Sequence, residues 1–308
     1  MQKGIWIYQD SLDYISPENR VTLNEGGTEL EKVLINSKTV FFKHEENNPN
    51  LSFKDRSMAY WISKYNELGK REFVISSSGN AAVSAISYCK LINAKLKVFV
   101  SKEIPKYKFE NILKASESRN SIEITKSQKP KSDAIKYSKL NNCINLRGSE
   151  ADFAIEGFKT LGYELYEQNK DIDAVFVCCS SGTSTIGLAQ GYNKIAGHIP
   201  QIHIVQTTKI CPIASQFDKN YEKAINSIAN AVSDKIAKRK ENVLDIVKSS
   251  NGFGWVVSDQ EIIEAKKELV KLGIKVEGYN AYVSYAGYKK SVKQRGIYKN
   301  PVCIISGV

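Results

Sequence analysis

A regular alternation of strand-like and helix-like segments constrains this chain more than any other feature. Apolar runs typical of strands recur at 72–76, 96–100, 121–125, 143–146, 174–178, 202–206, 253–257 and 302–305. Segments with helical spacing lie among them, at 81–91, 107–116, 132–140, 153–167, 185–195, 259–272 and 281–292. Strands that alternate with helices form mostly parallel sheets covered by helices. The sequence therefore predicts an α/β protein.

Two local patterns add detail. Ser258 and Glu261 have the spacing of a capping box at the start of the helix over 259–272. The tract from the end of the 202–206 strand to about Lys248 is polar and helix-prone, and its densest cluster of lysines, 235–240, is expected on the polar side of one helix. No internal repeat or long linker interrupts the pattern.

Lys54 is placed by the apolar spacing around it. Residues 40–43 suit a short strand, and the apolar positions from Met58 to Leu68 recur at helical spacing. Lys54 is therefore expected where a loop passes into a helix. The positive end of a helix disfavours a second positive charge, so a lysine there favours its free amine, which can form a Schiff base with a carbonyl. The alternative is an ordinary solvated lysine.

Two small-residue turns each join a predicted strand to a predicted helix. One is Ser76–Asn80, and the other is Ser180–Ser184. Each would present hydroxyl groups and backbone N–H groups at a helix N-terminus, which is a ready site for an anion. Simple capping of the helix is the alternative for both turns.

Residues 48–56, NPNLSFKDR, resemble the NPTGSFKDR segment of threonine synthase and its relatives, the fold-type II enzymes that depend on pyridoxal 5′-phosphate (PLP). The entry segment LNEGGTEL at 23–30 and the helix segment EGFKT at 156–160 also resemble that family, and the similarity spans about residues 23 to 307. The resemblance implies that Lys54 carries PLP as a Schiff base and is the catalytic residue.

The resemblance also assigns roles to the two turns and to the last strand. In SSGNAA, it implies that Asn80 binds the cofactor and that Ser77, Ser78 and Gly79 bind the substrate carboxylate. The turn after the 174–178 strand corresponds to a glycine-rich phosphate loop, so the PLP phosphate is expected at Ser180, Ser181, Gly182, Thr183 and Ser184. Ser306, at the end of the last strand, would bind the pyridine nitrogen.

Three of the departures from the family pattern bear on the cofactor site and the reaction. Asn50-Leu51 replaces Thr-Gly, Gly182 is the single glycine of the phosphate loop, and Gly278-Tyr279 alters a segment that lies near substrate in relatives. The favoured function is a PLP-dependent lyase that, like threonine synthase, converts O-phosphohomoserine to threonine and phosphate. A serine or threonine dehydratase, a cysteine synthase-like β-replacement enzyme acting on an activated serine, and a catalytically degenerate PLP-binding regulator stay open.

The family further implies two domains. Residues 1–57 and 146–308 would form a large PLP-binding domain, and residues 58–145 a small inserted domain. The expected partner is an amino-acid substrate, and a homodimer is left open.

Composition limits the other classes of function. The net charge of +11 comes from lysines spread over most segments, which favours anionic substrates or cofactors over nucleic acid. Six cysteines without a C-x-x-C pair and three histidines provide no zinc spacing, so no metal is expected. Most of the cysteines fall in apolar runs and are expected to be reduced core residues. No apolar run approaches the length of a membrane span and the first residues do not resemble a secretory signal, so no membrane partner and a cytoplasmic location are expected.

Overall fold

The structure is a computed structural model that describes residues 4–117 and 121–307. The chain forms two compact units. The first unit comprises the residues up to Gly26, Asn48–Asn50 and Lys54–Gly157, and the second comprises Gly27–Asn47, Leu51–Phe53 and the chain from Phe158 onward. The domain boundaries that the family resemblance implies stay a prediction.

The first unit contains a four-stranded parallel sheet in the order β5-β4-β3-β6. Its strands are β3 (Glu72–Ser76), β4 (Lys95–Ser101), β5 (Ile122–Ser127) and β6 (Ile144–Asn145). Its helices are α1 (Lys54–Glu67), α2 (Asn80–Leu91), α3 (Lys106–Ser116) and α4 (Pro130–Asn141), with the short 3₁₀ helices η1 (Gly4–Tyr8) and η2 (Pro17–Asn19) near the start of the chain. Most residues of α1 are buried, which marks it as a core helix rather than a surface one.

The second unit is built on a six-stranded sheet in the order β1-β2-β10-β7-β8-β9. Its strands are β1 (Leu30–Ile35), β2 (Lys38–His44), β7 (Ala174–Cys178), β8 (Gln201–Thr207), β9 (Phe253–Val257) and β10 (Pro301–Ile305). The edge strand β1 is antiparallel to β2, and the other pairs are parallel. The antiparallel edge strand is the part of the sheet that strand–helix alternation did not predict.

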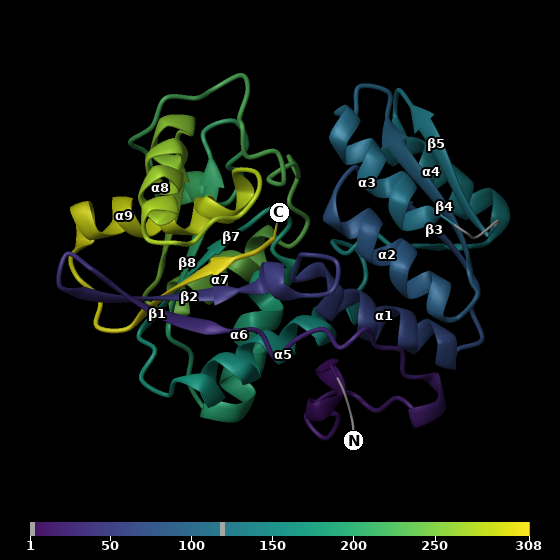
Figure 1. Cartoon of the computed structure of the whole chain (residues 1–308), viewed down its shortest axis with the longest axis horizontal. Coiled ribbons are helices and arrows are strands. Elements are labelled where there is room, and N and C mark those ends of the chain that lie inside the picture. Colours follow the sequence, from purple (N-terminus) through teal and green to yellow (C-terminus); the bar gives the residue numbers. More distant parts are fainter. Residues whose placement is uncertain (1–3, 118–120, 308) are drawn as a thin grey trace. The chain divides into compact units, whose positions relative to one another are not determined.

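Helices cover both faces of this sheet. Helices α8 (Asp259–Lys271) and α9 (Val283–Arg295) lie on one side of the strands and α6 (Thr183–Ala196) on the other (Figure 1). Helix α7 (Lys240–Ser249) packs on α6 and on strands β8 and β9. The remaining elements are α5 (Phe153–Gln168) and the 3₁₀ helices η3 (Glu45–Asn47), η4 (Ala214–Gln216) and η5 (Asn280–Tyr282).

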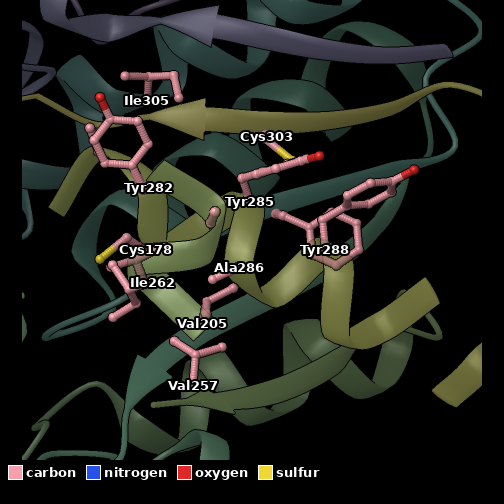
Figure 2. Packing of buried hydrophobic residues seen from close by; sticks show 14 of the residues in the cluster. Cys178, Val205, Val257, Ile262, Tyr282, Tyr285, Ala286, Tyr288, Cys303 and Ile305 are labelled. Atoms are coloured by element: carbon pink, nitrogen blue, oxygen red, sulfur yellow. The ribbon is translucent and has the colours of Figure 1, made fainter. Parts of the chain in front are cut away.

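The core of the second unit includes aromatic side chains between α9 and the sheet. Tyr282, at the end of η5, and Tyr285 and Tyr288 of α9 recur at three-residue spacing, and Figure 2 shows them with Cys303 and Ile305 of strand β10. The Tyr285 ring packs edge-on against Phe42, with 5.5 Å between the ring centroids. Strands β7 and β10 are buried at every residue, which is why they appear in the sequence as continuous apolar runs.

The parallel strands of the second unit bring distant turns to one edge. Because β10 pairs with β7 in parallel, the turns that follow both strands leave the sheet at the same end. Ligands of open α/β sheets bind at this carboxyl end. The turn at 180–184 and Ser306 therefore share one edge, as does the segment that follows β8.

The predicted α/β fold class is confirmed, as is the capping box of α8. The Ser258 hydroxyl accepts a hydrogen bond from the Glu261 N–H at 3.2 Å, and the Glu261 carboxylate accepts one from the Ser258 N–H at 2.7 Å. The six cysteines are all buried and form no disulfide, as expected.

The prediction that Lys235–Lys240 lie on one helix is wrong. Between Thr207 and Lys240 the structure has only the three-residue η4 in regular secondary structure, and α7 begins at Lys240. The backbone of this segment bonds instead to side chains from other elements: the Ile228 N–H donates to Asp259 at 3.1 Å and the Ala231 N–H to Asn280 at 2.9 Å. These long-range bonds outweigh the local preference of the polar residues for helix.

Candidate functional site

Lys54 is the first residue of α1, as the sequence predicts, and it is half-buried. The residue before it, Phe53, belongs to the second unit, where its N–H donates to the Ser306 carbonyl oxygen at 3.2 Å. Ser52 adds a side-chain bond from its hydroxyl to the same carbonyl at 3.1 Å. The backbone that leads into Lys54 is thus tied to the end of the last strand.

Asp55, the next residue, is a buried carboxylate in the first turn of α1. It accepts hydrogen bonds from the Asn50 N–H at 2.6 Å and from the Ser84 hydroxyl at 2.6 Å. Burial raises the pKa of Asp55 to about 6, against the lowering effect of these hydrogen bonds. Because Ser84 lies on α2, Asp55 ties the start of α1 to α2 within the first unit.

The departure from the family pattern at Asn50-Leu51 has a local structure. The Asn50 amide donates to Asp55 at 2.8 Å and accepts from the Ser87 hydroxyl at 2.7 Å. Leu51 has a φ of +57° and an exposed side chain. A positive φ is the conformation that glycine adopts most readily, which explains why the related motif has glycine there.

The turn Ser77–Asn80 lies at the carboxyl end of β3 and opens α2. The Ser77 hydroxyl accepts from the Gly79 N–H at 3.3 Å, and the Ser78 hydroxyl accepts from the Ser101 N–H at 3.4 Å. Gly79 is the N-cap of α2 and, as a glycine, makes no side-chain cap hydrogen bond. The position that a Cβ of Gly79 would take is open space. An anion can therefore approach this helix end.

The turn Ser180–Ser184 opens α6 in the same manner. Gly182 is the N-cap with a φ of +94° and, as a glycine, makes no side-chain cap hydrogen bond. A Cβ on Gly182 would lie 2.4 Å from the Val243 side chain of α7, so the backbone can take this course only without a side chain. The Ser181 and Thr183 hydroxyl groups are 3.1 Å apart and hydrogen-bonded to each other.

Ser180 has a different contact from the one expected of a phosphate ligand. Its hydroxyl oxygen accepts from the N–H groups of Ser233 and Asp234, at 3.1 and 3.3 Å. This residue anchors the segment 233–234 to the start of the loop. Its hydroxyl hydrogen is still available to donate.

Ser306 follows strand β10 directly and is buried. The register pairs Cys303 with Phe176 of β7, so Ser306 continues level with Cys179, just before the loop at 180–184. Gly307 has a φ of +137°, and a Cβ there would lie 2.7 Å from the Leu51 carbonyl oxygen. The Ser-Gly ending is therefore required by close packing.

The predicted residues divide between the two units. Lys54, Ser77, Ser78, Gly79 and Asn80 lie in the first unit. The loop 180–184 and Ser306 lie in the second.

Both loops fit the group that the sequence implies. Each offers several hydroxyl groups and the N-terminus of a helix of at least twelve residues whose N-cap is glycine. Hydroxyl and backbone donors at a helix N-terminus are suited to a phosphate or a carboxylate. The residues of 180–184 would hold the PLP phosphate, and those of 77–79 a carboxylate.

A buried acidic residue of the first unit escaped the sequence analysis. The Tyr88 hydroxyl donates to Glu25 at 2.6 Å, and burial raises the pKa of the Glu25 carboxyl. Glu25 also contributes to the raised pKa of Asp55. Its place in the family-like entry segment was the signal that could have identified it.

The second unit has its own buried polar cluster. Lys43 is fully buried and pairs with Glu164 at 2.5 Å while donating to the Thr28 carbonyl at 2.6 Å. The buried pair of Lys43 and Glu164 thus holds the segment around Thr28 in place. A lysine inside the apolar run 40–43 was the available signal.

No helix in the described part of the chain is long and apolar enough to cross a membrane. No group of three or more His, Cys, Asp or Glu side chains in residues 4–117 and 121–307 could hold a metal ion.

Comparison with known proteins places this geometry in a family. Residues 21–307 match the model of the family described as pyridoxal-phosphate dependent enzyme. Threonine synthase of Methanocaldococcus jannaschii is 29% identical over 99% of this chain and 80% of its own length. The biosynthetic L-threonine dehydratase of Haemophilus influenzae is 25% identical over 87% of this chain and 52% of its own length.

The fold is shared with solved structures at lower identity. A pyridoxal 5′-phosphate-dependent aspartate racemase superposes with a TM-score of 0.75 and 19% identity, over 91% of this chain and 89% of its own. The predicted family resemblance and the predicted cofactor are confirmed.

Proposed function

Because the chain belongs to the family of pyridoxal-phosphate dependent enzymes, we propose that it is a threonine synthase-like lyase that converts O-phosphohomoserine to threonine and phosphate. The observation that carries the proposal is the similarity to threonine synthase over nearly the whole chain, with Lys54 of SFKDR at the first position of α1. The glycine N-caps of α2 and α6 support it, since a substrate carboxylate and a cofactor phosphate are both anions that can bind at a helix N-terminus.

The residues of the chain have separate roles in this proposal. When bound, PLP supplies the electron sink that stabilises negative charge on the substrate carbon. The Lys54 amine would hold the cofactor, and as a free amine it would move protons at the α and β carbons of the substrate as general base and acid. Ser77, Ser78 and Gly79 bind the carboxylate, and Asn80 orients the cofactor ring.

The second unit completes the assignment. Ser181, Gly182, Thr183 and Ser184 bind the phosphate of the cofactor, together with the hydroxyl hydrogen of Ser180. Ser306 donates to the pyridine nitrogen. A neutral hydroxyl partner leaves that nitrogen largely unprotonated, which suits elimination and replacement better than transamination.

Replacing Lys54 with alanine tests the cofactor link. The purified wild-type protein is expected to be yellow, with absorption at roughly 410–420 nm from the bound cofactor. After borohydride reduction, mass spectrometry should find the cofactor on the peptide that contains Lys54. K54A should lose both signals. A cofactor fixed to another lysine in the wild type would contradict the assignment.

The reaction is tested by incubating the enzyme with O-phosphohomoserine. We expect phosphate and threonine to appear in equal amounts. Release of ammonia and a 2-keto acid from serine or threonine, with no phosphate from O-phosphohomoserine, would contradict the favoured reaction.

A serine or threonine dehydratase is the second candidate. The dehydratase relative supports it, as does the altered segment at Gly278-Tyr279, where the Tyr279 ring packs below the Lys266 ammonium at 4.5 Å. β-Replacement on an activated serine is tested in the same assay by adding O-acetylserine and sulfide. Cysteine formation would favour it over both other reactions.

A further inference from the structure

A cavity of about 440 Å³ in the second unit has a lining that neither the fold nor the proposed reaction explains. Its walls come from the residues that follow β8 and from the irregular segment before α7. We call it the lysine cavity, because Lys209, Lys223 and Lys235 all line it.

All the charged side chains that line this cavity are positive. Its lining includes the three lysines and neither aspartate nor glutamate. Within the part of the chain that the structure describes, no carboxylate forms an ion pair with any of the three ammonium groups. Like charges gathered around a concave wall attract and concentrate anions.

The carboxylates nearest in sequence are engaged elsewhere. Asp218 pairs with the buried Lys290 at 2.7 Å and also accepts from the Val256 N–H at 3.0 Å. Asp234 accepts from the N–H groups of Ile236 and Ala237, both at 3.4 Å. Glu222 lines an adjoining cavity of about 620 Å³, which shares Lys223 with the lysine cavity and also contains Asp259 and Glu261. The lysine cavity therefore carries three ammonium groups with no carboxylate in its own lining.

The remaining lining suits a small organic anion. The Tyr221 hydroxyl is hydrogen-bonded to the Cys211 thiol at 3.3 Å, which joins the two walls. Ser215 adds a second hydroxyl group, and Ile210 and Pro212 add apolar surface. Hydroxyl donors and ammonium groups beside a short apolar wall fit a phosphate group carried on a small carbon chain.

The cavity is also connected to the phosphate loop of the same unit. Lys235 directly follows Asp234, whose N–H donates to the Ser180 hydroxyl at the start of that loop. An anion that draws Lys235 inward would therefore act on the segment that Ser180 anchors.

From these observations we propose that the lysine cavity is a binding site for a small phosphorylated molecule, separate from the site for the cofactor phosphate. Two sources share this chemistry: the phosphate of a phosphorylated amino-acid substrate, and a free phosphorylated effector. The first source rests on the proposed function, whereas the second does not depend on which reaction the enzyme catalyses.

Calorimetric titration of the PLP-saturated holoenzyme with inorganic phosphate and with pyrophosphate tests the proposal, since the cofactor then occupies the loop at 180–184. We expect saturable binding that is about tenfold weaker in K223A and in K235A, because each removes one charge-assisted contact. K209A should behave in the same way. The matched control is K267A, which removes an exposed lysine from the middle of α8 and should bind like the wild type. Binding equal in all variants, or none in the wild type, would overturn the proposal.

Kinetics with O-phosphohomoserine distinguish the two sources. If the lysine cavity binds the phosphate group of the substrate, K223A and K235A should raise KM with little change in kcat. If it is a free effector, KM is unchanged and phosphate alters the rate of PLP dissociation in the wild type but not in the variants. A wild-type enzyme that binds phosphate without turning over O-phosphohomoserine would keep the site and refute the proposed reaction.

Discussion

Helices α6 and α8 both begin at the carboxyl edge of the same sheet, but their first turns are built in opposite ways. The α8 turn is closed by its own side chains, Ser258 and Glu261, which bond to each other's backbone N–H groups. The α6 turn begins at Gly182, an N-cap residue that has no side chain with which to bond the first N–H groups. One helix start is complete by itself, whereas the other is suited to an anion from outside.

This difference separates a structural helix start from a functional one. A capping box contributes stability wherever it stands and needs no ligand. A glycine N-cap contributes little stability but lets the backbone approach a ligand closely. Loss of the α8 cap should therefore affect folding alone, and a change at α6 should affect cofactor binding as well.

The largest expected effect is that of replacing Gly182 with alanine. The alanine must adopt a φ of +94°, and its Cβ would lie 2.4 Å from the Val243 side chain. We expect the free energy of unfolding to fall by about 2 kcal/mol. PLP affinity, measured by fluorescence titration, should fall by at least roughly tenfold as the loop backbone shifts.

The double variant G182A/V243A isolates the steric part of this effect. It removes the side chain that the new Cβ would meet but leaves the positive φ. PLP affinity should recover in part relative to G182A alone. Unchanged affinity in G182A would show that the α6 start is no more specialised than that of α8.

A third helix start, that of α1, extends the comparison to pH. A carboxylate in the first turn of a helix normally gains stability as it ionises, but burial raises the pKa of Asp55 to about 6. The folded state then holds more protons than the unfolded state between about pH 4 and pH 6, so Asp55 lowers stability as pH rises through that range. The slope amounts to at most about 1.4 kcal/mol per pH unit.

Comparing urea unfolding of wild type and D55N at several pH values measures this contribution. The variant loses hydrogen bonds and starts from a lower stability, so the slope between pH 4 and pH 6 is the informative quantity. We expect the decline with rising pH to be weaker in D55N. Parallel curves for the two proteins would contradict the raised pKa.

The smallest expected effect is that of Ser258→Ala at the start of α8. Loss of the N-cap hydroxyl should lower the free energy of unfolding by about 1 kcal/mol. PLP affinity should not change, because the cap bonds only within its own helix. Weaker PLP binding in S258A would show that the start of α8 also affects the cofactor site, and would contradict its purely structural role.

The sequence by itself determined those features that depend on neighbouring residues. Alternating apolar runs predict the strands and helices because burial of a strand or a helix face repeats with a short period. Lys54 at the start of α1 and the Ser258–Glu261 capping box follow from spacings of a few residues. Both are confirmed, and the roles of the site residues stay predictions.

Tertiary structure alone decided the features that depend on distant partners. The segment before α7 is irregular because Asp259 and Asn280 bind its backbone, although its composition favours helix. Gly182 must be glycine because Val243, far along the chain, fills the space of a Cβ. The lysine cavity exists because that irregular segment folds against the residues after β8. No local pattern encodes these contacts, since each depends on packing between segments that the chain brings together only on folding.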